Sequence, residues 1–533
     1  MSCGNPTTEP DALMQRRKKY DKTKNCVRCK DAQGNIVIRH TVYCKNCFTP
    51  LLIHKFRRVL EPTVNPKPDG PRRTALKPAG NLVIGFSGGL GSSVLLDLVH
   101  RCYVALDKST MPTEGGRDHP RHERVWKKVT VCYVEVCDAF PGMDDRTDEI
   151  AHFVSRYDEL DFVPLRIQHA FDRTWWERMG RSTSFSDIGV GLADESLLIE
   201  PLSQTYPDPL TALRTYLSSL PTPTAIHSSI QALTRVLLLH TALQTGSSHL
   251  VLGTSLTSLA VSLISGVAQG AGFNVREESM EEWTPDPETR PTPDTVPDDG
   301  TEGARKSKEA KRTVRIVRPL RDIGMKECAT WAWWSHIPVV GKEKWVWPGA
   351  KPGIGTLTKD FILGLEQDYP STVSTIVRTC GKLAPKGEVA GKCILCGRPA
   401  QRGVQEWKAR ISIRSQPPPP PSDSDSTDAP ATPAPVVPES KADTRPSLTP
   451  YLCYPCHTTL TSRSARPVPS PWPDTAHSSV APLPVWTEAR LGTHADVGVS
   501  VADEEEIAVA KKMGQEEMKG IVNEFLLDDE EAS

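Results

Sequence analysis

Eight of the chain's cysteines form four Cys-x-x-Cys pairs, a spacing that is typical of metal-binding thiolates. Each pair can offer two thiolates to one ion, and four soft thiolates suit tetrahedral Zn²⁺. The first two pairs, Cys26/Cys29 and Cys44/Cys47, are separated by 14 residues. We therefore predict a structural zinc site near the amino terminus, with four protein ligands and no open coordination position.

The other two pairs are Cys393/Cys396 and Cys453/Cys456. They are separated by 56 residues, of which 415–449 are rich in Pro, Ser and Asp. Without that segment, 21 residues would separate the pairs, an interval close to that of a zinc ribbon. These pairs predict a second structural zinc site, and we interpret His457, next to the last cysteine, as a bystander rather than a ligand.

A third candidate site is a glycine-rich loop that follows the apolar run 81–86 and precedes a helical pattern. Its sequence, SGGLGS at 87–92, has the character of an anion cradle, because backbone N–H groups at such a turn point toward a bound phosphate. The loop is not a Walker A motif, since no Gly-Lys-Ser/Thr follows, and its glycine spacing differs from that of dinucleotide-binding loops. The expected phosphate-binding residues are Ser87, Gly88, Gly89, Ser92 and Ser93.

The elements around this loop alternate between strand-like and helical patterns, which favours an α/β fold with a doubly wound parallel sheet. We expect strands at 81–86, 129–136, 161–167, 249–253 and 314–320. We expect helices at 92–106, 144–157, 228–245, 256–269 and from 322 onward.

A length of 533 residues favours two to four domains. Two segments, 281–310 and 415–449, have too few apolar residues to offset the entropy of ordering, so we expect disordered insertions there. The expected divisions are a zinc-knuckle module at 1–60, an α/β domain at 78–385, a zinc-ribbon-like module at 386–465, and a tail with an acidic helix at 466–533.

The net charge of -1 conceals a strong asymmetry. Residues 1–80 contain 17 Lys or Arg and 6 Asp or Glu, whereas residues 501–533 contain 3 and 11. A basic arm predicts binding to a polyanion, and the acidic tail indicates a protein contact or a solubilising role. The sequence has neither a secretory leader nor an apolar stretch long enough for a bilayer, so we expect a cytoplasmic protein without membrane contact.

The loop at 87–92 resembles the PP-loop, Ser-Gly-Gly-x-Asp-Ser, of the ATP pyrophosphatases, which adenylate a carbonyl oxygen and release pyrophosphate. Cysteine pairs on both sides of such a domain resemble the tRNA 2-thiolation group. The resemblance narrows to the cytoplasmic tRNA 2-thiolation protein 2 family through the segments at 317–327, 360–383, 393–399 and 521–531.

The residues that carry chemistry in active PP-loop enzymes are replaced here. Gly91 stands where the PP-loop has Asp, and residues 253–258, GTSLTS, stand where active members have Gly-His-x-x-Asp-Asp. Hydroxyls are weaker ligands than carboxylates for Mg²⁺. The cysteines that handle sulfur in the family are absent from 225–243 and 337–353. Of the six other cysteines, we interpret five as small core residues: Cys102, Cys132, Cys137, Cys328 and Cys380.

The resemblance and these departures together predict a non-catalytic subunit of a cytosolic tRNA thiolation complex. The resemblance implies a heterodimer with cytoplasmic tRNA 2-thiolation protein 1, which would bind ATP and Mg²⁺. It also implies sulfur supply from a thiocarboxylated ubiquitin-related modifier, and 2-thiolation of the wobble uridine (U34) of the tRNAs for Lys, Glu and Gln to form 5-methoxycarbonylmethyl-2-thiouridine. Two alternatives stay open: a self-sufficient ATP-dependent tRNA sulfurtransferase, and a zinc-ribbon RNA-binding scaffold.

Overall fold

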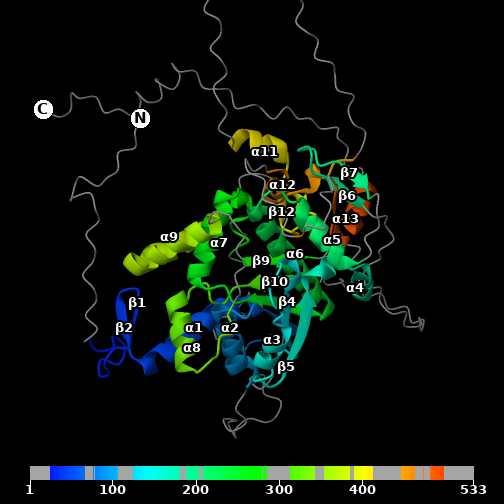
Figure 1. Ribbon diagram of the computed structural model, residues 1–533. Coiled ribbons are helices and arrows are strands. Elements are labelled where there is room, and N and C mark those ends of the chain that lie inside the picture. Colours follow the sequence, from blue (N-terminus) through cyan, green and yellow to red (C-terminus); the bar gives the residue numbers. More distant parts are fainter. Residues whose placement is uncertain are drawn as a thin grey trace, which may run out of the picture. The chain divides into compact units, whose positions relative to one another are not determined.

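A six-stranded sheet forms the centre of the computed structural model (Figure 1). Its strands, in spatial order, are β5 (Leu160–Arg166), β4 (Val129–Glu135), β3 (Asn81–Phe86), β8 (Ser247–Leu252), β10 (Val314–Val317) and β9 (Met280–Trp283). The structure describes residues 24–65, 76, 79–105, 124–180, 188–202, 208–278, 280–284, 313–341, 353–383, 389–411, 446–462, 472 and 480–496. Among these residues, no helix combines the length and apolar character that crossing a membrane requires.

All neighbouring strands of this sheet are parallel except β9, which pairs antiparallel with β10 at the edge. The chain runs from β3 outward to β4 and β5, and β8 then lies on the opposite side of β3. This reversal creates a switch point between the carboxyl ends of β3 and β8, where α/β sheets commonly bind ligands. The predicted central parallel sheet is confirmed, and its phosphate-like loop lies at that switch point.

Helices cover both faces of the sheet. On one face, Leu82, Ile84 and Phe86 of β3 share a buried core with α1 (Lys45–Val64), α2 (Leu90–Val99), α3 (Thr147–Val154) and α8 (Met325–Trp334). On the other face, Gly85 leaves room for Leu238 of α6 (Pro223–Gln244), which lies 3.3 Å from the position of a Cβ atom there.

The start of α6 follows from local sequence. The Thr222 hydroxyl accepts a hydrogen bond from the Ala225 N–H at 3.1 Å, and Pro223 occupies the first helical position, where a missing N–H costs nothing. Apolar residues at 226, 230, 233 and 237 then repeat at helical spacing and are buried. A helix of this length positions β8 and its following loop beside β3.

Smaller elements surround the sheet. A second core joins α7 (Leu256–Ala268), α9 (Ile354–Asp368) and α10 (Pro370–Cys380). The cysteine pairs lie near two hairpins, β1/β2 (Ile36–Ile38, Thr41–Tyr43) and β11/β12 (Val389–Lys392, Pro399–Gln401). The other elements are η1 (His100–Val104), η4 (Cys137–Ala139), η5 (Ile167–Phe171), α4 (Arg173–Arg178), α5 (Pro209–Ser219), η6 (Ala271–Asn274), α11 (Val404–Ile411), η8 (Thr449–Tyr451) and α12 (Tyr454–Thr461).

Some expected boundaries need correction. The segment 281–310 was expected to be an insertion, yet Glu281–Trp283 belong to β9. The expected tail from 466 contains β13 (Val480–Pro482), which pairs with β6 (Ile188–Gly191) in a small sheet completed by β7 (Ile199–Pro201). The helix α13 (Val485–Asp496) follows β13. The basic residues 16–19, the rest of both expected insertions, and the acidic end lie outside the described residues.

A buried ion cluster ties the edge of the sheet to the hairpin β11/β12. Glu278 accepts hydrogen bonds from Arg318, at 3.4 Å, and from Arg398, which lies just before β12. Arg235 of α6 pairs with Glu281 of β9, and the side chains of Glu281 and Arg318 are only 4% and 6% exposed. Burying one charge of such a pair without its partner costs free energy, so removing any of these side chains would destabilise the cluster. The C-terminal module is therefore anchored to the sheet by charge.

Candidate functional site

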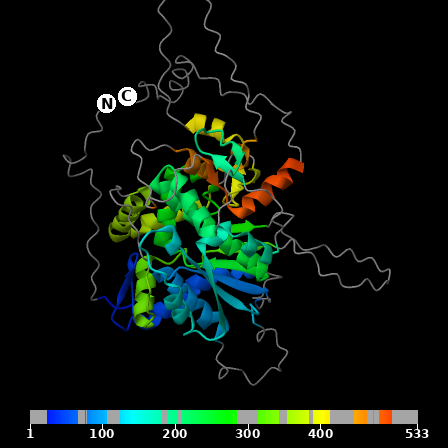
Figure 2. The ribbon, with the colours of Figure 1, turned by 45° about the vertical axis from the view of Figure 1, so that its right-hand side comes forward.

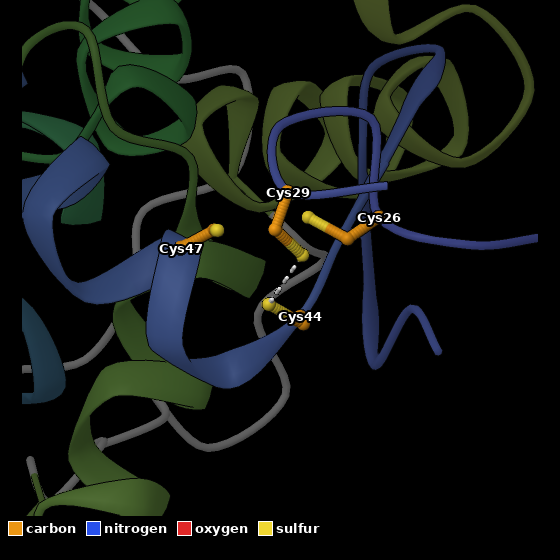
Figure 3. Close-up of side chains that lie close together, drawn as sticks. All are labelled: Cys26, Cys29, Cys44 and Cys47. Carbon is orange, nitrogen blue, oxygen red and sulfur yellow. Dashed lines mark hydrogen bonds between the residues drawn. The ribbon is translucent and has the colours of Figure 1, made fainter. Parts of the chain in front are cut away.

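The four N-terminal cysteines converge although they come from two separate segments (Figure 3). Cys26 and Cys29 lie on a tight turn, in which the Lys30 N–H donates to the Cys26 carbonyl at 2.8 Å and Lys30 adopts a left-handed φ of 66°. Cys44 is the N-cap residue of α1, and Cys47 lies in its first turn. The helix N-terminus favours thiolates because its dipole is positive there.

The four C-terminal cysteines repeat this construction. Cys393 and Cys396 lie on a turn closed by the Gly397 N–H, which donates to the Cys393 carbonyl at 2.8 Å, and Gly397 has a φ of 69°. Cys453 is the N-cap residue of α12, and Cys456 follows in the first turn. Each cluster thus pairs one turn with one helix N-terminus. The two pairs of the second cluster meet as expected, and the later pair lies at the start of a helix.

Both clusters fit a tetrahedral metal. Within each, the four Sγ atoms lie within 4.8 Å of one another. The Sγ–Sγ distance is 3.8 Å between Cys29 and Cys44 and 3.7 Å between Cys396 and Cys453. A tetrahedron with metal–sulfur bonds of about 2.3 Å has edges of about 3.8 Å, as zinc thiolates require. His457 lies outside the second cluster and hydrogen-bonds through Nε2 to the Glu195 carbonyl at 3.0 Å, so it acts as the expected bystander.

The predicted phosphate loop lies between β3 and α2, but its hydroxyls point into the protein. Ser92 and Ser93 both donate to the Gly89 carbonyl, at 2.8 and 3.2 Å, and the Ser87 and Ser92 hydroxyls lie 3.3 Å apart. Ser93 is fully buried. Gly88 has a left-handed φ of 72°, which glycine adopts without strain. The loop therefore forms a tight glycine turn before α2, while two of its three hydroxyls bond to the carbonyl at the start of that helix.

A neighbouring segment lies against this turn. The Gly341 N–H donates to the Gly88 carbonyl at 2.9 Å. The guanidinium of Arg146, which is partly buried, donates to the Val340 carbonyl at 2.8 Å and to Glu149 at the same distance. A Cβ atom on Gly88 would lie 3.0 Å from the Gly341 carbonyl oxygen. The segment 338–341 is thus fastened over the phosphate loop from two sides.

Gly91, which replaces the PP-loop aspartate, has no room for any side chain. A Cβ atom there would lie 2.1 Å from the Gly253 carbonyl oxygen, a separation that atoms without a bond cannot adopt. A Cβ on Gly253 would in turn lie 2.5 Å from the Ser92 nitrogen. The loops that follow β3 and β8 are therefore in backbone contact at the switch point, and the carboxylate lost at position 91 could not be restored without moving one of them.

The first of the two missing acids after β8 is Thr257, whose hydroxyl joins three helices. Its side chain is fully buried; the hydroxyl accepts from the Met325 N–H of α8 at 2.9 Å and donates to Glu366 of α9 at 2.7 Å. The Leu256 N–H at the start of α7 donates to the Ile323 carbonyl. The Thr257 hydroxyl therefore links α7 to α8 and α9.

Replacing Thr257 by valine is expected to destabilise the protein by about 1–3 kcal/mol, because the buried Met325 N–H loses its acceptor while side-chain volume is kept. Urea unfolding of the two full-length proteins would measure this change. The exposed Thr356 of α9 offers a matched Thr→Val control, expected to change stability by less than about 0.5 kcal/mol. Equal effects at the two positions would contradict a structural role for the Thr257 hydroxyl.

The buried carboxylate nearest the end of β4 is also fully used. Glu135 accepts hydrogen bonds from the Tyr133 hydroxyl at 2.9 Å and from the backbone N–H groups of Val136, Cys137 and Arg146 at 2.7–2.9 Å. With both oxygens occupied, it has little capacity left for a metal ion.

Five cysteines of the described residues lie outside the clusters, and they are poor nucleophiles. Burial raises the pKa of Cys132 and of Cys137 to about 12, and it raises the pKa of the other three as well. Their thiols stay protonated near neutral pH, whereas the reactive species is the thiolate. Cys132 and Cys328 are buried as expected, while the others are partly exposed.

Comparison with known proteins connects this geometry to a family. The family model described as cytoplasmic tRNA 2-thiolation protein 2 matches residues 353–458, which include α9, α10 and the second cysteine cluster. Proteins of that name from Danio rerio and Homo sapiens are 27% and 25% identical, over 70% of this chain and 72% and 71% of their own lengths. The chain is a relative of cytoplasmic tRNA 2-thiolation protein 2. The resemblance inferred from the sequence is confirmed.

Two further similarities differ in extent. Cytoplasmic tRNA 2-thiolation protein 2 from Anopheles gambiae is 40% identical over 86 residues, which are 16% of this chain and 21% of that one. Among solved structures, the U34-tRNA thiolase NcsA from Methanococcus maripaludis, with its [4Fe-4S] cluster, aligns with a TM-score of 0.42 and 16% identity over 74% of this chain and 98% of that one. The assignment of the fold rests on the strand order and not on this alignment.

Proposed function

We propose that this chain acts in the 2-thiolation of cytoplasmic tRNA as a subunit that does not itself catalyse sulfur transfer. The relatives that share 70% of the chain are named for that process. The strand order supplies a switch point at the carboxyl edge of the sheet, where α/β proteins commonly bind nucleotides. The residues at that site distinguish a catalytic subunit from a non-catalytic one.

The backbone contact between Gly91 and Gly253 carries the proposal. It occupies the position at which an active member needs a carboxylate, and the next acid position is the hydrogen-bonded Thr257. Mg²⁺ takes oxygen ligands, chiefly carboxylates and phosphates, and no aspartate or glutamate occurs in the loop 87–92 or the loop 253–258. Adenylation by this chain alone would therefore lack its metal ligands.

The resemblance to the family supplies the rest of the proposed reaction. ATP and Mg²⁺ would bind to a homologous PP-loop partner, cytoplasmic tRNA 2-thiolation protein 1, in a heterodimer. Sulfur would come from a thiocarboxylated ubiquitin-related modifier and be placed on the wobble uridine of tRNA Lys, Glu and Gln. This chain would support the partner's fold and hold the tRNA.

We propose that zinc occupies both cysteine clusters. The tetrahedral Sγ spacing and the all-thiolate donor set suit Zn²⁺, and four protein ligands leave no position open for a substrate. The N-terminal metal would hold the hairpin β1/β2 against α1, and the C-terminal metal would hold the turn before β12 against α12. Their contribution is to folding.

A radiolabelled ATP assay tests the proposed division of labour. This chain alone is expected neither to release pyrophosphate nor to thiolate tRNA, while the mixture with its partner is expected to do both. Thiolation should then depend on the acids and cysteines of the partner. Pyrophosphate release by this chain alone at the rate of the mixture would instead establish a self-sufficient sulfurtransferase. Tight tRNA binding with no effect on the partner's activity would indicate an RNA-binding scaffold.

A further inference from the structure

Helix α8 contains three tryptophans with three different environments. Trp331 is buried and donates from Nε1 to Asp97 at 2.8 Å. Trp334 packs edge-on against Phe48 of α1, with ring centroids 5.2 Å apart. Trp333 is 75% exposed, although tryptophan is usually among the more buried residue types. The packing of Trp331 and Trp334 helps to hold α8 in place, whereas the packing of the helix does not account for a tryptophan at position 333.

Two lysines lie on or against α8. Lys326 lies two helical turns before it on the same side of α8 and reaches the Val37 carbonyl of the hairpin β1/β2 at 3.2 Å. Lys45, at the start of α1, lies 6.0 Å from the ring of Trp334. Figures 1 and 2 show the hairpin and α1, in blue, beside α8, in light green.

Acidic side chains near this surface are neutralised. Glu327 is buried and pairs with Lys55. Asp322 pairs with Arg58 at 2.7 Å. Of the eight Lys or Arg in residues 24–58, Lys55, Arg57 and Arg58 pair with acids, and the other five share that segment with one acid, Asp31. The hairpin and the start of α1 therefore carry a net positive charge beside α8.

We propose that Trp333 stacks on an unpaired RNA base while Lys326, Lys45 and the basic hairpin contact the adjacent phosphates. Exposed aromatic rings flanked by cations are the usual platform for single-stranded nucleic acids, because every base has a π-face and every nucleotide has a charge. The inference rests on the proposed role in tRNA thiolation and names the surface that would hold the RNA.

The same surface is less suited to a protein partner. The other exposed side chains of α8 are Lys326 and Ala329, so Trp333 is not part of a wide apolar patch on the helix. The cores of protein interfaces are also depleted in lysine. RNA can stack a base on the ring and pair its phosphates with the lysines, whereas a protein partner would mainly cover the ring.

Binding of two RNAs by the full-length chain, alone and with its partner, tests this inference. One RNA is an unmodified anticodon stem-loop, and the other is a fully paired duplex of equal length. Trp333→Ala is expected to weaken stem-loop binding by about tenfold to a hundredfold, the usual effect of losing a stacked base, and to leave duplex binding unchanged. Trp333→Phe should keep most of the affinity. Lys326→Gln should lower the salt dependence by about one counterion, which Trp333→Ala should not do.

Phe361→Ala is the matched control, because Phe361 is 58% exposed on α9 and is expected to leave both affinities unchanged. Unchanged stem-loop binding by Trp333→Ala, or an equal loss for both RNAs, would overturn the stacking role. Loss of partner assembly with RNA binding intact would reassign Trp333 to a protein interface. If the wild-type complex binds neither RNA, the proposed function fails together with this inference; if it binds the stem-loop and Trp333→Ala binds equally, only the inference fails.

Discussion

Replacing Cys26 by serine is expected to remove the metal from the N-terminal cluster and to unfold the hairpin β1/β2. The hairpin has only three residues in each strand, so its own hydrogen bonds and packing are too few to hold it. Structural zinc contributes on the order of 10 kcal/mol to the folding of small zinc domains, and most of that would be lost with one ligand. Elemental analysis should give about two zinc ions for the wild-type chain and about one for Cys26→Ser.

Cys380→Ser is the control for that experiment, because Cys380 lies at the end of α10, outside both clusters. Its metal content should equal that of the wild type. Fewer than one metal ion per chain in folded wild-type protein would refute metal binding by the clusters, and a different metal in both clusters would refute the assignment to zinc alone. Hydrogen exchange of residues 24–43 should show the local unfolding directly.

A side chain at position 91 is expected to destabilise the protein by about 3 kcal/mol or more. Gly91 lies in the first turn of α2, where alanine would normally be favourable, so lack of space is the dominant effect. The clash is with the Gly253 carbonyl, and backbone yields less readily than the end of a side chain. Urea unfolding of Gly91→Ala measures the effect. Gly91→Asp, which restores the PP-loop sequence, is expected to be at least as unstable and to release no pyrophosphate from ATP.

Gly355→Ala provides the opposite case. Gly355 lies in α9 with no atom within 4 Å of a Cβ position, so alanine should stabilise the protein by about 0.5–1 kcal/mol through its helix propensity. The sign of the two substitutions should therefore differ. A stable Gly91→Asp protein would show that the loops at the switch point can separate, and it would contradict the closed contact between Gly91 and Gly253.

The cysteine clusters and the central strands were predictable because their signals are local. A Cys-x-x-Cys pair fixes two ligands within one turn, and an apolar run such as 81–86 predicts a buried strand. The edge strand β9 was not predicted, because its sequence MEEW carries two glutamates, of which Glu281 is buried against Arg235 and Glu282 is exposed. That pairing is a tertiary property that no local pattern shows.

The contact that closes the phosphate loop could not be predicted from the sequence either. The replacement at Gly91 showed that a carboxylate was missing, but not that Gly253 lies against that position. Likewise, the sequence indicated only that Thr257 stands in place of an acid. In the structure its buried hydroxyl hydrogen-bonds to both α8 and α9. The sequence of the second cluster left open whether its later pair formed a hairpin knuckle or began a helix, because both tolerate the same spacing.

The ion cluster at the sheet edge has a consequence for biosynthesis. Glu278 and Arg318 leave the ribosome long before Arg398, and the burial that they share in the finished protein requires all three charges. Domains normally fold as units from the amino terminus during synthesis. This sheet is an exception, because its β9–β10 edge cannot exclude water until the turn at Cys393–Cys396 has formed and packed against it. A nascent chain halted before residue 398 would therefore expose this polar edge, and the fold would stay incomplete until about three-quarters of the chain had been translated.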